Sequence, residues 1–474
     1  MSRLGTEAAA LARWSDAERL CALKRIIPKR CVTEALRHAG RDRTFCPVLP
    51  AWLAVWFVVG IGLFCGDCYR QVYRWLVRWA RDKPVPPRST LCEARKRIGA
   101  RPLALLAGSV VGLLADPFAP GDAGAFYRGM RLMALDGFTL DLPDTPANDR
   151  AFGRPSTGRA RGAFPQARVL ALCEAGTHAL WKWLLKPYRV GEVTMAPALL
   201  RHLRPGMLLL WDRNFLKYAH VGQVLSAGAH LLARVKGDVT LAPRKRLADG
   251  SYLARLYRSP YDRARDRGGI DVRVVEYTLD DPDRPGHGEE HRLLTTLLDE
   301  TPDPAGGLVE LYHVRWEQEL AIDELKTHQR ERPGPDAVLR SRTPAGVVQE
   351  VYALLLAHYV VRSLMHEAAR GKAISPLRLS FTGTLKILRC RLPQCPRAEC
   401  WHECGHKRAH ERGLRRWWRD LLAEVAQETL PPRRNRINPR VIKRKMSNWK
   451  KKRPRHLNYP QPTKEFRDAI VIQR

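Results

Sequence analysis

The 474-residue sequence predicts a mixed α/β fold, in which a sheet domain with helices on both faces follows a small helical domain and precedes a basic tail. Three observations support this. Helical periodicity fills the first part of the chain, short strand-like runs alternate with helices in the middle, and basic residues crowd the end. The length favours two or three domains, because single cores stop growing at about 250–300 residues.

The charge of the chain is its unusual compositional feature. Lys and Arg number 82 against 48 Asp and Glu, which gives a net charge of +34. Such an excess indicates a polyanionic partner, and nucleic acid is the commonest. An anionic membrane is the alternative. Hydrophobic residues make up 45% of the chain, which excludes a wholly disordered protein.

Eleven cysteines are scattered along the chain without a regular framework, which predicts reduced thiols in a cytoplasmic protein. The first residues show no signal peptide, so no export is expected. Five residues between Cys390 and His406 form a C-x4-C-x4-C-x3-C-x-H pattern. Zinc sites usually contain tighter C-x2-C pairs, so we interpret this cluster as reduced cysteines and keep a zinc site as the alternative.

A helical domain is predicted for residues 1–118. Capping boxes at Ser15–Glu18 and Thr90–Glu93 open helices that Pro28 and Gly99 end. Between them, residues 67–81 carry an apolar stripe and an arginine every four residues. With so basic a chain, we interpret this domain as DNA-binding, although a solvated basic face would give the same pattern.

Residues Val48–Cys65 contain no charge over 18 residues, about the minimum for a membrane span. Basic residues flank both sides without asymmetry, and the rest of the chain has the pattern of a soluble protein. We therefore predict a buried helix and no membrane association, with a membrane-associated basic protein as the rival interpretation.

The segment 116–130, rich in Pro and Gly, marks a boundary, and the α/β domain is predicted for residues 126–375. A β-rich insertion is expected at about 237–298. Helices are expected at about 307–328 and at 345–369. The basic region 376–474 ends in a run of Lys and Arg suited to phosphate backbones. The predicted strands are Leu132–Asp136, Arg168–Cys173, Leu180–Tyr188, Met207–Asp212 and His230–Val235.

Two aspartates follow apolar strand-like runs. Asp136 closes MALD and Asp212 closes MLLLWD. Carboxylates held rigidly at strand ends suit hard divalent cations, which phosphodiester chemistry requires. An acid after a strand is also a common turn residue, so either one alone is weak evidence.

A third candidate acid lies in the segment LYHVRWEQELAIDELK, where Tyr312, Arg315, Glu319 and Lys326 are spaced by three, four and seven residues. This spacing places all four on one face of a continuous helix. A carboxylate between two cations suggests a metal ligand beside phosphate contacts, but an exposed helix with ion pairs has the same spacing. The nearby Glu317 and Glu324 leave the identity of the ligand open.

These residues resemble the insertion-sequence-four family of DDE transposases, whose third motif is Tyr-x2-Arg-x3-Glu-x6-Lys. LDGFTLDLPDTPANDRAFG and WDRNF are similar to the regions of the first and second Asp in that family. The N-terminal helices and the PPRRNRINPRVIKRKMSNWKKKRP tail are similar as well, so the resemblance spans nearly the whole chain.

The resemblance implies an RNase H-like catalytic core with a β-rich insertion, and cleavage and transfer of insertion-element ends by two-metal-ion chemistry. Asp136, Asp212 and Glu319 would then be ligands of Mg2+, with Mn2+ as a substitute, and Tyr312, Arg315 and Lys326 would contact DNA-end phosphates. The implied partners are terminal inverted repeats, target DNA and a second copy in a synaptic dimer. A bacterial cytoplasmic protein associated with the nucleoid is expected, with excision through a hairpin in many relatives. The rival function is a non-catalytic DNA-binding protein.

Overall fold

The computed structural model of the chain describes all residues except 1–18, 43–48, 79–84, 158–159, 332–337, 397–406, 432–440, 443–449, 459 and 474. The capping box at Ser15–Glu18 and most of the basic tail therefore lie outside the described residues. The chain forms two compact units. The first comprises Met1–Gly129, Asp136–Met195 and Glu317–Leu430; the second comprises Met130–Leu135, Ala196–Trp316 and Pro431–Arg474. The predicted domain boundaries stay a prediction.

The N-terminal helices of the first unit surround an apolar core, as the helical periodicity predicts. They are α2 (Cys21–Ile26), α3 (Lys29–His38), α4 (Ala51–Leu63), α5 (Tyr69–Leu76), α6 (Arg88–Ile98) and α7 (Arg101–Val110). Gly99 ends α6 with a positive φ of 65°, a conformation that favours glycine. The predicted capping box at Thr90–Glu93 is wrong, because α6 begins at Arg88 with Pro87 as its N-cap.

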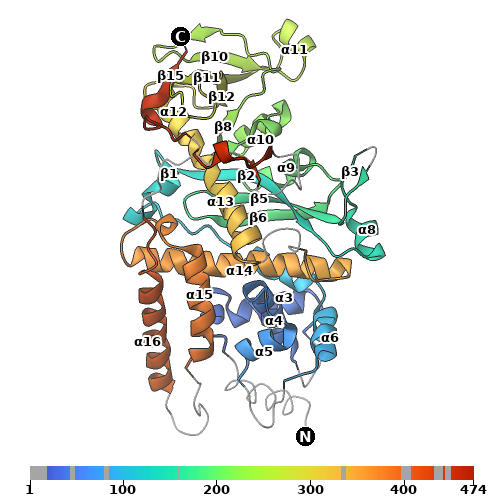
Figure 1. Cartoon of the computed structure of the whole chain (residues 1–474). Helices are drawn as coiled ribbons and strands as arrows, with labels where there is room; N and C mark the ends of the chain where they lie inside the picture. Colours follow the sequence, from blue (N-terminus) through green and yellow to red (C-terminus); the bar gives the residue numbers. More distant parts are fainter. Residues whose placement is uncertain are drawn as a thin grey trace. The chain divides into compact units, whose positions relative to one another are not determined.

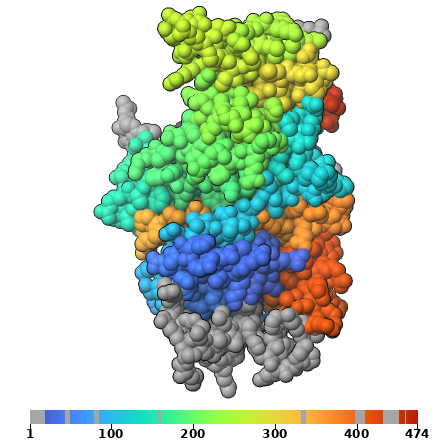
Figure 2. All heavy atoms as spheres, turned by 180° about the vertical axis from the view of Figure 1, so that it is seen from behind, coloured from blue at the N-terminus to red at the C-terminus, as the bar shows by residue number. Residues whose placement is uncertain are grey.

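Three later helices complete this core. They are α14 (Pro344–Arg370), α15 (Phe381–Arg391) and α16 (Lys407–Val425). Figure 1 shows α15 and α16 side by side at α14, and Arg391 pairs with Glu424 between them at 2.5 Å. In Figure 2 the N-terminal helices, in blue, lie beside the residues of α15 and α16, in orange and red. The N-terminal helices therefore share one core with helices from the other end of the chain.

The long helix α14 also faces a second core in the same unit. Its residues Val347, Val351 and Leu355 pack with the strands of the sheet and with Leu325. By length and composition α14 could cross a membrane, but 72% of its apolar window is buried inside the protein. The apolar segment predicted as a buried helix forms the 13-residue α4, which is buried and packs on α14. Both apolar helices are thus accounted for by the protein core.

The sheet of the first unit has the order β6-β5-β2. Strands β5 (Gln166–Glu174) and β6 (Ala179–Pro187) form an antiparallel hairpin, with Val169 opposite Leu185. Strand β2 (Met130–Asp141) begins in the second unit and continues into the first. The smaller elements of this unit are η1 (Pro120–Ala125), β1 (Phe126–Tyr127), α8 (Pro146–Phe152), β3 (Ser156–Thr157), β4 (Ala160–Arg161), η5 (Pro376–Arg378) and η6 (Leu392–Gln394).

The sheet of the second unit has the order β2-β7-β8-β12-β11-β10-β9. Strands β2, β7 and β8 are parallel, whereas β12, β11 and β10 continue in antiparallel pairs. The β-rich segment predicted for about 237–298 therefore forms, and it extends the sheet from β8. The segment contains β9 (Lys245–Arg246), β10 (Tyr252–Leu256), β11 (Ile270–Leu279) and β12 (His291–Thr295). The other strands of this sheet after β2 are β7 (Met207–Trp211), β8 (His230–Arg234) and β15 (Ile470–Ile472).

Helices of this unit connect and flank these strands. They are α9 (Glu192–Leu200), which starts in the first unit, η2 (Arg213–Phe215), α10 (Tyr218–Ser226), α11 (Pro260–Ala264), α12 (Ala305–Tyr312) and η3 (His313–Arg315). The short elements β13 (Val441–Ile442), β14 (Lys450–Lys451), η7 (Pro454–His456) and η8 (Arg467–Ala469) belong to the C-terminal region. Strand β15 of this region pairs with β11, which ties the chain end to the sheet.

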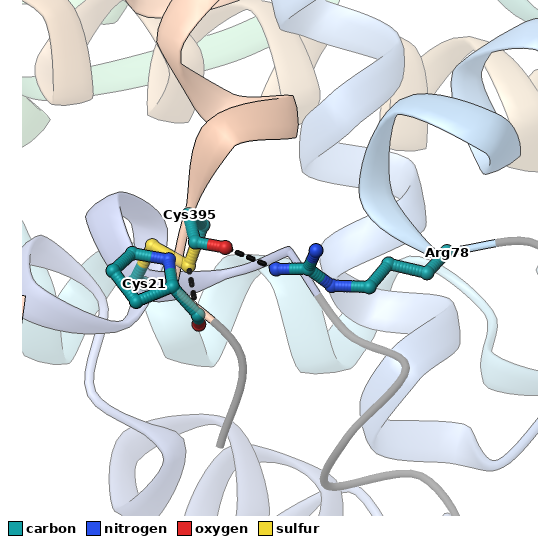
Figure 3. The surroundings of a disulfide bond; sticks show 4 residues. Cys21, Arg78 and Cys395 are labelled. Carbon is teal, nitrogen blue, oxygen red and sulfur yellow. Dashed lines mark hydrogen bonds between the residues drawn. A yellow bond between two sulfur atoms is a disulfide. The ribbon is translucent and has the colours of Figure 1, made fainter. Parts of the chain in front are cut away.

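One disulfide in the first unit corrects the prediction that all cysteines are reduced. Cys21 of α2 is bonded to Cys395, which follows η6, with Cα atoms 6.2 Å apart. Figure 3 shows this bond, and the guanidinium of Arg78 donates to the carbonyl of Cys395. The two cysteines are 374 residues apart, so only the packing of the helices brings them together. The disulfide also removes Cys395 from the Cys390–His406 cluster, of which Cys400, His402, Cys404 and His406 lie outside the described residues.

Candidate functional site

The two candidate aspartates are the next residues after a cross-strand pair of the second unit. In the parallel register of β2 and β7, Leu135 lies opposite Trp211. Asp212 directly follows β7 and caps η2, as the sequence predicts for a strand end. Asp136 differs, because β2 continues to Asp141 and Asp136 lies inside the strand. The apolar run of the sequence ends at Asp136, whereas the strand continues to Asp141. The sequence shows only the end of the apolar run.

Both aspartates are partly buried, and each accepts a hydrogen bond from the backbone amide that follows it. Gly137 N donates to Asp136 Oδ1 at 2.8 Å, and Arg213 N donates to Asp212 Oδ1 at 2.7 Å. Such local bonds fix the orientation of a carboxylate relative to its own strand. Rigidly held carboxylates are the kind of group that a metal site requires.

The segment that carries the third acid is helical but not one continuous α-helix, which corrects the prediction for 307–328. It consists of α12, the 3-10 turn η3, α13 (Trp316–Asp323) and the π-helical turn η4 (Glu324–His328). Tyr312, Arg315, Glu319 and Lys326 each fall in a different one of these four segments. Because 3-10 and π turns change the rotation per residue, the single helical face inferred from the spacing does not hold.

In the second unit, Tyr312 lies next to the last residue of β7, Trp211. It is only 9% exposed, and its hydroxyl donates to the carbonyl of Trp211 at 3.3 Å. Burial raises the pKa of Tyr312 above its usual range, and the charge of Asp212 adds to this effect. The guanidinium of Arg315 lies 5.9 Å from the centroid of the Tyr312 ring. Both residues of the motif therefore lie close to the backbone that carries Asp212.

In the first unit, the three glutamates that the sequence left open have different surroundings. Glu317 pairs with His178 at 2.8 Å. Glu324 is buried among His178, His358 and Arg362. Burial opposes ionisation of Glu324, but Arg362 and the histidines outweigh it and hold the pKa of that carboxyl well below its usual range. Glu319 lies between them and is partly exposed.

Lys326, in η4, is also partly buried. Burial lowers the pKa of Lys326, whereas the charge of Asp141 raises it. A lysine that is half withdrawn from water beside a carboxylate gains from an additional anion in contact with its ammonium group. This surrounding is compatible with the predicted phosphate contact, which stays a prediction.

The donor set suits a hard divalent cation, because Mg2+ binds carboxylate oxygens. Asp136 and Glu319 belong to the first unit and Asp212 to the second. Within the described part of the chain, no group of three or more His, Cys, Asp or Glu residues is arranged to hold a metal ion. The assignment of the three ligands therefore stays a prediction.

Sequence reasoning missed the residues that surround the glutamates. His178 and Arg362 lie 146 and 38 residues from Glu324, and no local pattern links them to it. One general signal was available for Glu324, because a carboxylate has to find a partner if it is buried. The partners themselves become visible only in the fold.

Comparison with known proteins supplies the family. Residues 127–360 match the family model described as "Transposase DDE domain", and residues 17–107 match "Insertion element 4 transposase N-terminal". The transposase InsG for insertion sequence element IS4 of Escherichia coli (strain K12) is 28% identical over 430 residues, which are 89% of this chain and 90% of InsG. The putative transposase InsZ of the same strain is 30% identical over 130 residues, 27% of this chain and 42% of InsZ.

The two matches together span well over half of the chain, and the chain belongs to the IS4 family of DDE transposases. It is thus an enzyme of the class that cleaves and transfers DNA with divalent metal ions. A solved synaptic complex of the piggyBac transposase with hairpin DNA is similar with a TM-score of 0.42 at 12% identity, covering 88% of this chain and 86% of that chain.

Proposed function

We propose that the chain cleaves the ends of an insertion element and transfers them to target DNA, with Asp136, Asp212 and Glu319 as the ligands of Mg2+. The observation that supports this most strongly is the parallel register of β2 and β7, in which an aspartate follows each residue of the Leu135–Trp211 pair. The family of the chain gives the reaction class, and we infer an RNase H-like core for its α/β domain.

The choice of Glu319 over its neighbours is supported by its place in the motif, which Tyr312, Arg315 and Lys326 complete. Glu317 and Glu324 instead contact His178, and Glu324 also pairs with Arg362. When bound, Mg2+ would neutralise charge at the scissile phosphate and make water or a 3′-hydroxyl a better nucleophile. The three carboxylates of the chain would hold the cation in place.

Arg315 and Lys326, which lie on either side of Glu319 in the sequence, are proposed to contact phosphates of the DNA end. Tyr312 belongs to the same motif, but its buried hydroxyl donates to Trp211. With this bond in place, Tyr312 would contact a phosphate only through the edge of its ring. Its hydroxyl would reach a phosphate only after the bond to Trp211 is broken. In the structure, this bond holds Tyr312 against the end of β7, directly before Asp212.

Basic surfaces outside this region are proposed to bind the rest of the DNA. On α5, Arg70 and Arg74 are exposed, and the described part of the tail exposes Lys451, Lys452 and Arg455. Each contact of this kind would make binding weaker as salt increases. We further propose that the protein acts in the bacterial cytoplasm as a dimer that holds both element ends.

A cleavage assay tests the proposal. The full-length protein is incubated with duplexes carrying the DNA that flanks its own gene, in Mg2+ or Mn2+, beside Glu319→Gln and Asp323→Asn. Asp323 is an exposed acid on the same helix, so its variant controls for loss of charge. Cleavage by the wild type and by Asp323→Asn, but not by Glu319→Gln, is expected. Wild-type protein that binds these duplexes and cleaves none of them would overturn the enzymatic proposal in favour of a non-catalytic DNA-binding protein.

A further inference from the structure

The buried side of α13 carries a glutamine next to Glu319. Gln318 is fully buried, and its Nε2 donates to the carbonyl of Ala171 at 2.9 Å. The same Nε2 lies 3.5 Å from the carbonyl of Asp136. One amide group therefore joins α13 to β5 and to β2 at the backbone of Asp136. The helical turn that carries Glu319 is thus fastened to the strand that carries Asp136.

A buried histidine holds α13 on both sides of Glu319. His178 is 2% exposed, and its Nε2 lies 2.8 Å from Glu317 Oε2. Its Nδ1 lies 2.9 Å from Glu324 Oε1. The imidazole ring thus bridges a carboxylate two residues before Glu319 and one five residues after it.

The backbone of His178 is itself unusual. It lies in the turn between β5 and β6 with a φ of 58°, in the left-handed region that residues other than glycine seldom adopt. Such a conformation costs on the order of 1 kcal/mol and persists where the surroundings determine it strongly. The two carboxylates on the ring are surroundings of that kind.

The far end of this network is closed by α14. Arg362 Nε donates to Glu324 Oε2 at 2.8 Å, and His358 Nε2 lies 3.2 Å from the same oxygen. A guanidinium nitrogen of Arg362 also lies close to His178 Nδ1. Burial lowers the pKa of His358, against the opposing effect of Glu324. Glu324 opens the π-helical turn η4, so the network fixes the point at which the regular helix ends.

We infer that Gln318 and His178 are positioning residues, which hold α13 so that Glu319 keeps its place relative to the Asp136 strand. This inference rests on the proposed function, in which Glu319 is a metal ligand. A carboxylate ligand has to be held within about 0.5 Å of its productive position. Outer groups that orient ligands typically contribute about 10- to 100-fold to metal affinity. Neither residue touches the metal, so each acts through Glu319.

The test compares two buried glutamines in the full-length protein. Gln318→Met removes the amide and keeps the chain length, and Gln349→Met is the matched control. Gln349 is 3% exposed, and its Nε2 donates to the carbonyls of Arg95 and Gly99 at 2.7 Å each, within the helical core. Both variants lose two amide-to-carbonyl bonds, so a general loss of stability affects both. His178→Gln is added as a second positioning variant, because the amide has one nitrogen in place of the two ring nitrogens that face Glu317 and Glu324.

Two quantities are measured on the protein bound to its DNA ends. Electron paramagnetic resonance of free Mn2+ gives the affinity for the metal without catalysis, and DNA nicking gives the Mn2+ concentration for half-maximal rate. In Gln318→Met and His178→Gln, we expect the affinity for Mn2+ to fall about 10-fold or more. The Mn2+ concentration for half-maximal nicking should rise by the same factor. Gln349→Met should match the wild type in both, whatever its melting temperature.

Glu319→Gln separates the two ways of failing. If Glu319→Gln binds Mn2+ and nicks DNA like the wild type, the proposed function of Glu319 is wrong. The other case is that Glu319→Gln loses Mn2+ binding and nicking while Gln318→Met and His178→Gln keep the metal dependence of Gln349→Met. That result would support Glu319 as a ligand and would overturn the positioning inference. If a positioning variant does not fold, the other one decides the outcome.

Discussion

Leu135 lies opposite Trp211 in the parallel register of β2 and β7, and the chain continues from each of them into an aspartate. Neighbouring parallel strands that run in register present their following residues at the same level. This relationship depends on backbone hydrogen bonds between the strands, so it does not depend on the rotamer of either carboxylate.

Asp136→Asn and Asp212→Asn are each expected to lower DNA cleavage by about 1,000-fold or more, because a neutral amide cannot hold a divalent cation that contributes several kcal/mol to the transition state. Binding of the DNA ends should change little. Nicking rates and gel-shift titrations measure the two effects. Asp144→Asn, an exposed aspartate three residues beyond the end of the same strand, should cleave at the wild-type rate, and equal loss in all three variants would contradict the assignment.

Arg362→Met is expected to destabilise the protein by about 3–5 kcal/mol, because it leaves the carboxylate of Glu324 buried without its main cation. The double variant Arg362→Met, Glu324→Gln should recover part of that loss, since the stranded charge is gone. Thermal unfolding of the three proteins measures this.

The matched control is Arg370→Met, in the same helix. Arg370 pairs with Asp116 at 3.5 Å, and its side chain is 53% exposed, so a loss of less than about 1 kcal/mol is expected. A double variant less stable than Arg362→Met would show that Glu324 is not the cause.

Gly62→Ala is expected to lower the free energy of unfolding by about 1–3 kcal/mol, because a Cβ there would clash with the backbone carbonyl of Ala353 where α4 meets α14. Gly108→Ala is the control. Gly108 is exposed within α7, and a Cβ added there would meet open space, so alanine should stabilise by up to about 1 kcal/mol. Melting temperatures that fall equally in both variants would mean that α4 and α14 are not closely packed.

The pH dependence of stability should carry the signature of Lys24. Burial lowers the pKa of Lys24 from 10.5 to about 8, with a smaller contribution from Lys29. The unfolded chain therefore binds the proton more tightly than the folded one. Below pH 8 the charged Lys24 destabilises the fold, and this penalty disappears as the pH rises toward 10.5.

Relative to Lys24→Met, the wild type should therefore gain about 1 kcal/mol between pH 8 and pH 10.5, a value reduced for the partial exposure of the side chain. Denaturant titrations at a series of pH values measure the difference. Parallel curves for the two proteins would show that Lys24 is solvated.

Much of the fold follows from local sequence signals. The helix expected at 345–369 forms as α14, with Thr343 capping it, and Met207–Trp211 forms a buried strand because its apolar run ends at a turn. Helix starts were harder to predict. Proline precedes α6, and its fixed φ lets the helix begin before the Thr90–Glu93 pattern suggests.

The candidate site was predicted less completely. Apolar periodicity cannot distinguish an α-helix from one with 3-10 and π turns, so the division at Arg315 and at Glu324 was not foreseen. His178 and Gln318 were missed for a different reason. A buried polar contact is defined by the partner that the fold provides, and the carbonyls of Asp136 and Ala171 carry no sequence signal.

The sharing of α14 between the N-terminal helices and the later strands has a consequence for synthesis. Helix α7 ends at Val110 and α14 starts at Pro344, so the 233 residues 111–343 separate them. At roughly 5–20 residues per second, a ribosome needs on the order of tens of seconds to bridge that interval. During that interval, the apolar surface of α4 that packs on α14 in the folded protein is not yet covered by α14. The nascent chain is therefore most prone to aggregate before its last third has emerged.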